Sequence, residues 1–312
     1  CGIVRSLEIG KDIEAEVRKK GLLKKVIIGN ALVDMYSKCG AIEKAREVFE
    51  ELPEKNVVSW NALITGYVQI GFGAEALECF TQMQNEGASP DVVTYVCILK
   101  ACGVLGCLEI GKDIDTKVRE QGLLQDSVVL GNALVDMYSK CGLLEKAQEV
   151  FEQLQVRDIV TWNSLISGSA QLGRVDMVLD LYNRMRVEDV PNLVTFIVLL
   201  NACSHAGLLE EGEKLFDEMC CVYCLNPTLE HYTCMIDLFG RAGHFDKVKA
   251  LLDRVQHFAH LPLFQSIMGY CRRWGNVKLG RWAFEESVQL DEKCAATYVC
   301  MGNIHAAVGM QT

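Results

Sequence analysis

The sequence predicts an all-α protein in which helical hairpins stack into a solenoid. The strongest observation is a verbatim repeat, because the twelve residues GNALVDMYSKCG occupy 29–40 and again 131–142. A repeat at a fixed distance is the signature of a repeat architecture. All five prolines fall between the expected helices, as a helical repeat requires. No segment shows sustained alternation of apolar and polar residues, so we expect no β-strand.

Composition agrees with stacked repeats that share one continuous core. The chain has 312 residues, which is more than one core usually supports, and no Pro-, Ser- or charge-rich linker divides it. Half of the residues are hydrophobic, yet no apolar run reaches the roughly 18 residues of a membrane span. The chain begins inside a repeat rather than with a signal segment, so we expect any targeting peptide to lie outside this sequence.

The fifteen cysteines are expected to pack between helices as small apolar residues. Cys102, Cys203 and Cys271 recur at one position of the repeat, so the repeat explains their placement. Free thiols in this number imply a reducing compartment. Cys221 and Cys224 form a lone C-x-x-C with no second pair, so we expect no metal and no cofactor.

Each unit is expected to hold two antiparallel helices. Within the first, Leu32, Met35 and Tyr36 recur at helical spacing, and Gly40 supplies the left-handed residue that ends the helix. An amphipathic second helix follows, with glutamates on its outward face. Its inward residues are Ile42, Ala45, Val48, Phe49 and Leu52.

A hydroxyl residue stands near the start of several first helices, where the units open with VVSWN, VVTYV or IVTWN. Ser59, Thr94 and Thr161 each carry a side-chain oxygen that can accept a hydrogen bond from an orphan backbone N–H. We therefore predict these three residues as N-caps.

Aligning the units on the fifth residue of each opening divides the chain into helical hairpins of 31 to 36 residues. The first three complete units together span the 102 residues that separate the verbatim copies. Residues 1–25 are the back end of one unit, and 295–312 are the front of another. The complete units are 26–56, 57–91, 92–127, 128–158, 159–192, 193–228, 229–260 and 261–294.

These openings and the alternation of 35-, 36- and 31-residue hairpins resemble the pentatricopeptide repeat (PPR) family, in its plant PLS class of mixed long and short repeats. By this resemblance 1–260 is a PLS array, and 261–312 looks like the C-terminal extension (E) motifs. The array reads as a truncated L repeat (1–25), then S (26–56), P (57–91), L (92–127), S (128–158), P (159–192), L (193–228) and a final S (229–260).

The family resemblance implies a function as well as a fold. It implies a right-handed superhelix of TPR-like hairpins that binds single-stranded RNA, one nucleotide per repeat, in a mitochondrion or chloroplast. An amide at a fixed place in each hairpin can meet a base edge, because it both donates and accepts hydrogen bonds. The amides at the fifth position are Asn30, Asn61, Asn132 and Asn163.

Two interpretations of these amides stay open at this point. They either read bases, or they cap and steady the helix start. For a reading role we expect them to face the groove rather than the core, so that replacing them with Ala would barely change the stability of the fold.

In the family's recognition code the fifth residue pairs with the last residue of the same unit. The resemblance implies uridine for Asn61 with Asp91 and for Asn132 with Asp158. It implies a pyrimidine for Asn30 with Asn56 and for Asn163 with Asn192. The 36-residue units depart from the code, and the final short unit has an unusual pair: Val96 with Ser127, Ile197 with Thr228, and Thr233 with His260.

Two further positions recur. Aliphatic residues at the second position either pack at the helix start or, as the family implies, sandwich the bases: Ile27, Val58, Val93, Val129, Val160 and Val194. Lys38, Lys140 and Arg241 share the thirteenth position of the short units and either touch phosphates or are solvated charges.

The net charge of −10 argues against a nucleic-acid ligand, since nucleic-acid binders usually show a basic surface. Much of the acid falls in the second helices, for example Glu43, Glu47, Glu145 and Glu149, which would face away from the groove. We infer binding that depends on base contacts more than on phosphate charge.

Three function classes follow. The first is a sequence-specific RNA-binding module, which the resemblance extends to a specificity factor for organellar C-to-U editing with a deaminase-bearing or editing-factor partner at the C-terminal extension. The alternative is a TPR-like protein-interaction scaffold, whose W-x-x-L-G-x-x-Y pattern is missing. An enzyme would need the zinc-deaminase signatures His-x-Glu and Pro-Cys-x-x-Cys, which this sequence lacks, so we expect no catalysis. Because no apolar run is long enough for a membrane span, we also expect no membrane partner.

Overall fold

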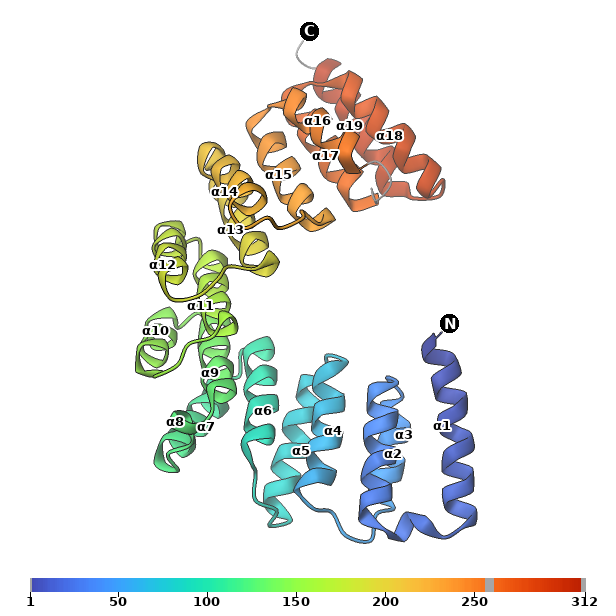
Figure 1. The fold of residues 1–312 in the computed structure, drawn as a ribbon. Helices are drawn as coiled ribbons and strands as arrows, with labels where there is room; N and C mark the ends of the chain where they lie inside the picture. Colours follow the sequence, from blue (N-terminus) through green and yellow to red (C-terminus); the bar gives the residue numbers. More distant parts are fainter. Residues whose placement is uncertain (1, 256–260, 310–312) are drawn as a thin grey trace. The chain divides into compact units, whose positions relative to one another are not determined.

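The computed structural model describes residues 2–255 and 261–309, and every regular element in these ranges is a helix (Figure 1). The all-α prediction is therefore confirmed. The chain divides into two compact units, with the boundary between Gly168 and Ser169 inside α11 (Ile159–Gln171). Among the described residues we find no helix with the length and hydropathy of a membrane span.

The first unit is a row of hairpins in which α2 packs on α4, α4 on α6, and α6 on α9. These first helices are α2 (Val26–Lys38), α4 (Val57–Gln69), α6 (Val92–Leu105) and α9 (Val128–Lys140). The second helices are α1 (Gly2–Lys19), α3 (Ile42–Glu50), α5 (Gly73–Asn85), α7 (Leu108–Glu120) and α10 (Leu144–Gln153). The short helices η1 (Leu22–Lys24) and α8 (Leu123–Asp126) precede α2 and α9.

The second unit repeats this arrangement, since α13 packs on α15, α15 on α17, and α17 on α19. The first helices are α13 (Leu193–Ala206), α15 (Leu229–Ala242), α17 (Leu261–Trp274) and α19 (Ala295–Gly309). The second helices are α12 (Val175–Glu188), α14 (Leu209–Cys221), α16 (Phe245–Val255) and α18 (Val277–Leu290).

The core lies between the helices of each hairpin and its neighbours. The five residues predicted to face inward from α3, Ile42 to Leu52, are all buried. Phe49 meets Trp60 edge-on at 4.7 Å between ring centroids, and Phe151 meets Trp162 at the same distance in the second copy. Such aromatic pairs add about 0.5–1.5 kcal/mol beyond area burial.

The repeated cysteines are packing residues, as predicted. Cys102, Cys203 and Cys271 are buried between helices, and burial raises their pKa to about 12, 11 and 12. Thiols with such pKa values stay protonated and unreactive at neutral pH. Cys221 and Cys224 are exposed, and no cluster of three or more metal-ligating side chains occurs within the described residues.

The prediction that Ser59, Thr94 and Thr161 are N-caps is wrong. The residue three positions earlier is the N-cap in each case: Asn56 for α4, Asp91 for α6 and Asp158 for α11. Each hydroxyl instead accepts from the N-cap backbone N–H, which completes a capping box. Two polar side chains therefore fix each helix start, the N-cap and the hydroxyl three residues later. The sequence pattern indicates the hydroxyl, which is the second of the two, as the N-cap.

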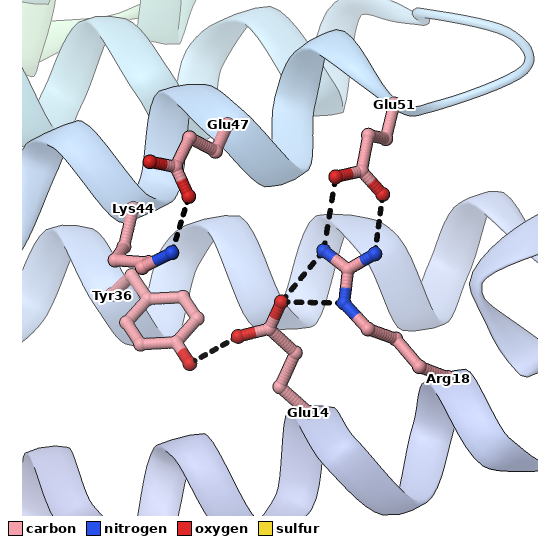
Figure 2. A network of polar contacts seen from close by, with 6 residues as sticks. All are labelled: Glu14, Arg18, Tyr36, Lys44, Glu47 and Glu51. Carbon is pink, nitrogen blue, oxygen red and sulfur yellow. Dashed lines mark hydrogen bonds and ion pairs between the residues drawn. The ribbon is translucent and has the colours of Figure 1, made fainter.

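Figure 2 shows a polar network that ties α1 to α2 and α3 and that the sequence did not predict. Arg18 bonds Glu14 on its own helix (2.7 Å) and Glu51 after α3 (3.1 Å), while the Tyr36 hydroxyl donates to Glu14 (2.6 Å). Burial alone would raise the pKa of Glu14, but the hydrogen bonds from Tyr36 and Arg18 outweigh it and hold that pKa below its usual value.

The second copy of the repeat rebuilds this network with different residues. The Arg119 guanidinium donates to Asp115 (2.7 Å) and to Gln153, and the Tyr138 hydroxyl donates to Asp115 (2.8 Å). Because Asp115 and Gln153 replace Glu14 and Glu51, the network depends on the acceptor positions more than on the acceptor type.

The close packing of α4 on α2 depends on Gly66, since a Cβ there would come within 2.6 Å of Ser37 Cβ and 2.8 Å of Ile42 Cδ1. We expect Gly66→Ala to destabilise the first unit by about 1–3 kcal/mol, because overpacking exceeds the gain in helix propensity. Urea unfolding followed by circular dichroism measures this.

The matched control is Gly269→Ala on α17, where a new Cβ meets nothing within 4 Å. This change should stabilise the protein by about 0.5–1 kcal/mol through helix propensity alone. Equal effects of the two changes would contradict the close approach of α2 and α4.

Candidate nucleic-acid interface

Three residues meet at three of the junctions between repeat units in the first half of the chain. They are the fifth residue of one unit, the last residue of that unit, and the third residue of the following unit, and we call this set a junction cluster. The three clusters within the first unit of the fold are Asn30–Asn56–Ser59, Asn61–Asp91–Thr94 and Asn132–Asp158–Thr161.

The cluster around Asn61 shows the geometry. Asn61 Nδ2 donates to Asp91 Oδ1 at 2.9 Å, and the Thr94 hydroxyl donates to Asn61 Oδ1 at 2.6 Å. The same Asp91 oxygen accepts the Thr94 backbone N–H at 2.9 Å, which caps α6. One carboxylate oxygen therefore starts a helix and holds the amide of the preceding unit.

The other two clusters keep this pattern. Asn132 Nδ2 donates to Asp158 Oδ1 at 3.0 Å, and the Thr161 hydroxyl donates to Asn132 Oδ1. In the remaining cluster an amide replaces the carboxylate: Asn30 Nδ2 donates to Asn56 Oδ1 at 3.3 Å, and Ser59 Oγ donates to Asn30 Oδ1 at 2.7 Å. The longer contact is consistent with a neutral acceptor.

The expectation that these amides lie outside the core is wrong. Asn30, Asn61 and Asn132 are only 7%, 9% and 7% exposed. A buried amide must be hydrogen-bonded to offset its desolvation, and each of the three is bonded at both its nitrogen and its oxygen. Of the two donors and two acceptor sites of each amide, the cluster uses one donor and one acceptor.

The carboxylates of two clusters are held in their charged form. Burial alone would raise the pKa of Asp91, but the Thr94 backbone N–H, the Asn61 amide and the Thr94 hydroxyl together lower it below its usual value. The pKa of Asp158 is lowered in the same way by Thr161 and Asn132. Both side chains therefore act as charged acceptors at neutral pH.

The second-position aliphatics form an exposed apolar row. Val58 precedes Asn61 by three residues and is 56% exposed, so the two side chains are neighbours on one helix face. Packing at the helix start, the alternative for these residues, is not what the structure shows. The other members of this row, all in the first compact unit, are 51% to 84% exposed: Ile27, Val93, Val129 and Val160. Val194, at the same position in the second compact unit, is 53% exposed.

The 36-residue units have no amide at the corresponding place. Val96 is buried, and Ser127 caps α9 by accepting the Leu130 N–H at 3.3 Å. Ile197 is half-buried. An aliphatic side chain thus stands in these units at the place where the junction clusters have a hydrogen-bonded amide.

The junction after α14 is unusual because Thr228 and His231 form its capping box. The Thr228 backbone N–H donates to His231 Nδ1 (3.1 Å), so Nε2 carries the proton and donates to the Leu193 carbonyl (3.0 Å). Burial lowers the pKa of His231, so the ring is neutral at pH 7.

The structure gives fewer contacts for the other residues that the sequence predicts to read bases. Asn192 caps α13 by accepting the Thr195 N–H at 3.0 Å, while Asn163 lies on α11 in the other unit, so their pairing stays a prediction. The Thr233 hydroxyl donates to the Leu229 carbonyl of its own helix at 2.9 Å. His260 lies outside the described residues.

The thirteenth-position cations are largely engaged on their own helices. Lys38 pairs with Asp34 (2.6 Å) and Lys140 with Asp136 (2.8 Å), in each case one turn earlier. Arg241 is half-buried on α15. Exposed pairs of this kind are worth about 0.3–0.5 kcal/mol, so the lysines can exchange their partner for a phosphate at little cost.

We expect Asn61→Ala to destabilise the first unit by about 1–2 kcal/mol, because it removes two hydrogen bonds and leaves the Thr94 hydroxyl and Asp91 short of a partner. Val58→Ala, an exposed change on the same helix face, should stay within about 0.5 kcal/mol. The urea midpoints of the two variants test this prediction. Equal midpoints would mean that the amide of Asn61 does not contribute to the stability of the fold.

The lowered pKa values of Asp91 and Asp158 make part of the stability pH-dependent. Their contribution is full above the unfolded pKa of about 3.9 and is lost as pH falls through the lower folded pKa. Asp91→Asn, which copies Asn56, should lower stability at pH 7 and reduce the loss between pH 5 and pH 2. Urea unfolding across this pH range measures the free energy of unfolding. An Asp91→Asn protein that loses as much stability between pH 5 and pH 2 as the wild type would contradict the prediction.

Comparisons with known proteins match most of the chain to repeat models. The model of the PPR repeat family matches residues 55–103 and 157–205. The PPR repeat model matches 30–57, 132–159, 194–224 and 230–258, and together the matches cover more than half of the chain.

Several curated relatives from Arabidopsis thaliana are similar along nearly all of this sequence. The chloroplastic pentatricopeptide repeat-containing protein CRR2 is 39% identical over 311 residues, which is 98% of this chain and 47% of that protein. The mitochondrial pentatricopeptide repeat-containing protein At2g03880 is 38% identical over 289 residues, which is 92% of this chain and 45% of that protein. The chain thus spans about half the length of the curated relatives it matches.

Solved structures show the same fold. The crystal structure of the pentatricopeptide repeat protein PPR10 from maize matches 97% of this chain and 45% of its own, with a TM-score of 0.75 at 19% identity. The structure of PPR10 in complex with an 18-nt psaJ RNA element matches with a TM-score of 0.74 at 18% identity. On its repeat matches, its fold and its relatives, the chain belongs to the pentatricopeptide repeat family.

Proposed function

We propose that this protein binds single-stranded RNA in a sequence-specific manner, with one nucleotide for each repeat. The observation that carries the proposal is the junction cluster, which recurs three times at one register in the first unit, each time beside an exposed aliphatic side chain. A lattice of identical donor–acceptor groups suits a ligand that repeats in the same way.

In this proposal the amides of the clusters contact the edges of the bases, and the exposed apolar row contacts their faces. The free N–H and the free oxygen lone pair of each amide can pair with the edge of a pyrimidine, which offers both donors and acceptors. The exposed apolar row offers surfaces on which base faces can lie. By the family code, the clusters with Asp91 and Asp158 select uridine, and the Asn30–Asn56 and Asn163–Asn192 pairs take a pyrimidine.

The acidic character of the chain is compatible with this kind of binding. The net charge is −10, and two of the candidate phosphate contacts, Lys38 and Lys140, are already paired with aspartates. Counterion release therefore contributes little, and affinity depends mainly on the bases. In this scheme, phosphate contacts from Lys38, Lys140 and Arg241 make only a minor contribution to the affinity.

The comparisons support an RNA ligand and an organellar site of action. PPR10, whose fold this chain shares, has been crystallised with an RNA element, and the relatives carry the names chloroplastic and mitochondrial. We infer that the whole protein works in one of these organelles.

We further propose the PLS division of residues 1–260 and the extension role of 261–312. In that scheme the protein is a specificity factor for C-to-U editing that has no catalysis of its own. It recruits a deaminase-bearing or editing-factor protein through the hairpins that begin at α17. The support for this step is the family resemblance of the motifs in 261–312.

The test is filter binding to single-stranded RNAs with permuted bases. Asn61→Thr with Asp91 retained should, by the family code, move the preferred base at one position from uridine towards guanosine. A general loss of stability cannot produce such an exchange.

Val96→Ala is the control, because that buried side chain offers no hydrogen bond and its truncation should leave every base preference unaltered. Wild-type protein that binds no RNA, or an Asn61→Thr variant that keeps its uridine preference, would instead favour a TPR-like protein scaffold.

A further inference from the structure

The third residue of a unit follows the chemistry of the fifth residue in the unit before it. Where the fifth residue is Asn, the next third residue carries a hydroxyl: Asn30 with Ser59, Asn61 with Thr94, Asn132 with Thr161, and Asn163 with Thr195. Where the fifth residue is Val96, Ile197 or Thr233, the next third residue is Leu130, His231 or Leu263. A capping role alone would not require this match.

The extension hairpin adds an amide of different length. Gln265, at the fifth position of its unit, is followed by Thr297, and it donates to the Cys294 thiol at 3.4 Å. The hydroxyl-to-amide bond is thus seen with Asn and not with the longer Gln.

The structure gives the reason for the match with Asn. The hydroxyl of Ser59 or Thr94 is fully buried and donates to the oxygen of the preceding amide. Its own oxygen accepts the backbone N–H of the N-cap, at 3.2 Å for Ser59 and 3.1 Å for Thr94. Its single hydrogen has two acceptors within reach, and the amide oxygen (2.7 Å and 2.6 Å) is nearer than the side-chain oxygen of the N-cap (3.1 Å and 3.0 Å). A group that can only donate here requires the oxygen of the amide, and not its nitrogen, to face it.

The last residue of the unit fixes the other end of the same amide. Asp91 Oδ1 faces Asn61 Nδ2, and an ionised carboxylate rejects the amide oxygen. The two neighbours together leave one orientation for Asn61. In that orientation the second N–H and the second lone pair of the amide have fixed directions.

The orientation of the amide decides which pyrimidine fits. Uridine presents an acceptor at O4 next to a donor at N3, whereas cytidine presents a donor at N4 next to an acceptor at N3. Rotating an Asn amide by 180° exchanges its donor and its acceptor, and thereby exchanges the better partner.

We propose that the third residue of each unit is a positioning residue that sets uridine against cytidine for the base read by the unit before it. The hydroxyls of Ser59, Thr94 and Thr161 do this through Asn30, Asn61 and Asn132. The proposal rests on the RNA-binding function proposed above, and it adds a third residue to the pair in the family code.

The experiment uses the protein with Thr94→Val, which keeps the shape of the side chain and removes the hydroxyl. The probe is a set of oligoribonucleotides in which each position in turn is uridine or cytidine, and the readout is the ratio of the two Kd values at each position. We expect the ratio of the cytidine Kd to the uridine Kd to fall about fivefold at one position, which is the effect of losing one hydrogen bond. Asn61→Ala should identify the same position.

Three controls separate a positioning role from a structural one. Thr94→Ser restores the hydroxyl and should restore the ratio. In the Thr94→Val protein the ratio at the base read by Asn132 should stay as in wild type. Ser59→Ala repeats the test at the Asn30 cluster, whose partner Asn56 is neutral, should Thr94→Val fail to fold.

The outcomes are distinct. Folded Thr94→Val protein that binds uridine and cytidine RNAs with an unchanged ratio, or that loses affinity equally at every position, overturns the inference. A wild-type protein that shows no RNA binding overturns the proposed function itself and is recognised before any variant is compared.

Discussion

At three boundaries between repeat units, a single side-chain oxygen atom holds neighbouring helices in register. Asp91 Oδ1 caps α6 through the Thr94 N–H and at the same time binds the amide of Asn61 from the preceding unit. A helix start and an inter-unit contact therefore share one acceptor, and a shift of either by one residue breaks both. The exposed apolar row follows from this constraint, because its members stand two residues after the N-cap and three before the fifth position of the unit.

The sequence predicted the fold class because the repeat distance and the helical spacing are both visible along the chain. The first helices begin at residues 26, 57, 92, 128, 159, 193, 229 and 261, the first residues of the units set by aligning their openings. The N-caps were misplaced by three residues, because a capping box has two polar members and only the hydroxyl stood inside the VVSWN pattern. The burial of Asn61 could not be predicted, because its partners Asp91 and Thr94 are 30 and 33 residues away.

Charge was harder to interpret than packing. The repeat pattern does not single out Arg18 or Glu14, and Tyr36 belongs to the apolar set of its helix, yet these three residues join α1 to α2 and α3. Arg119, Asp115 and Tyr138 form the same kind of contact in the second copy. Glu14, Glu51 and Asp115 therefore serve contacts between second helices and their neighbours. A net charge of −10 says little about the surface that carries the amides, because net charge sums over both faces of every hairpin.

The burial of the amides changes how recognition would be achieved. An exposed Asn loses side-chain freedom when it binds a base, whereas Asn61 is already held by Asp91 and Thr94 before any ligand arrives. Preorganised groups reduce the entropic cost of association, which matters most where phosphate attraction is weak. The same bonds that stabilise the junction then define the donor and acceptor that a base would meet. In the proposed scheme stability and specificity share these atoms, so a change at Asn61 would act on both, and only changes at its neighbours would separate them.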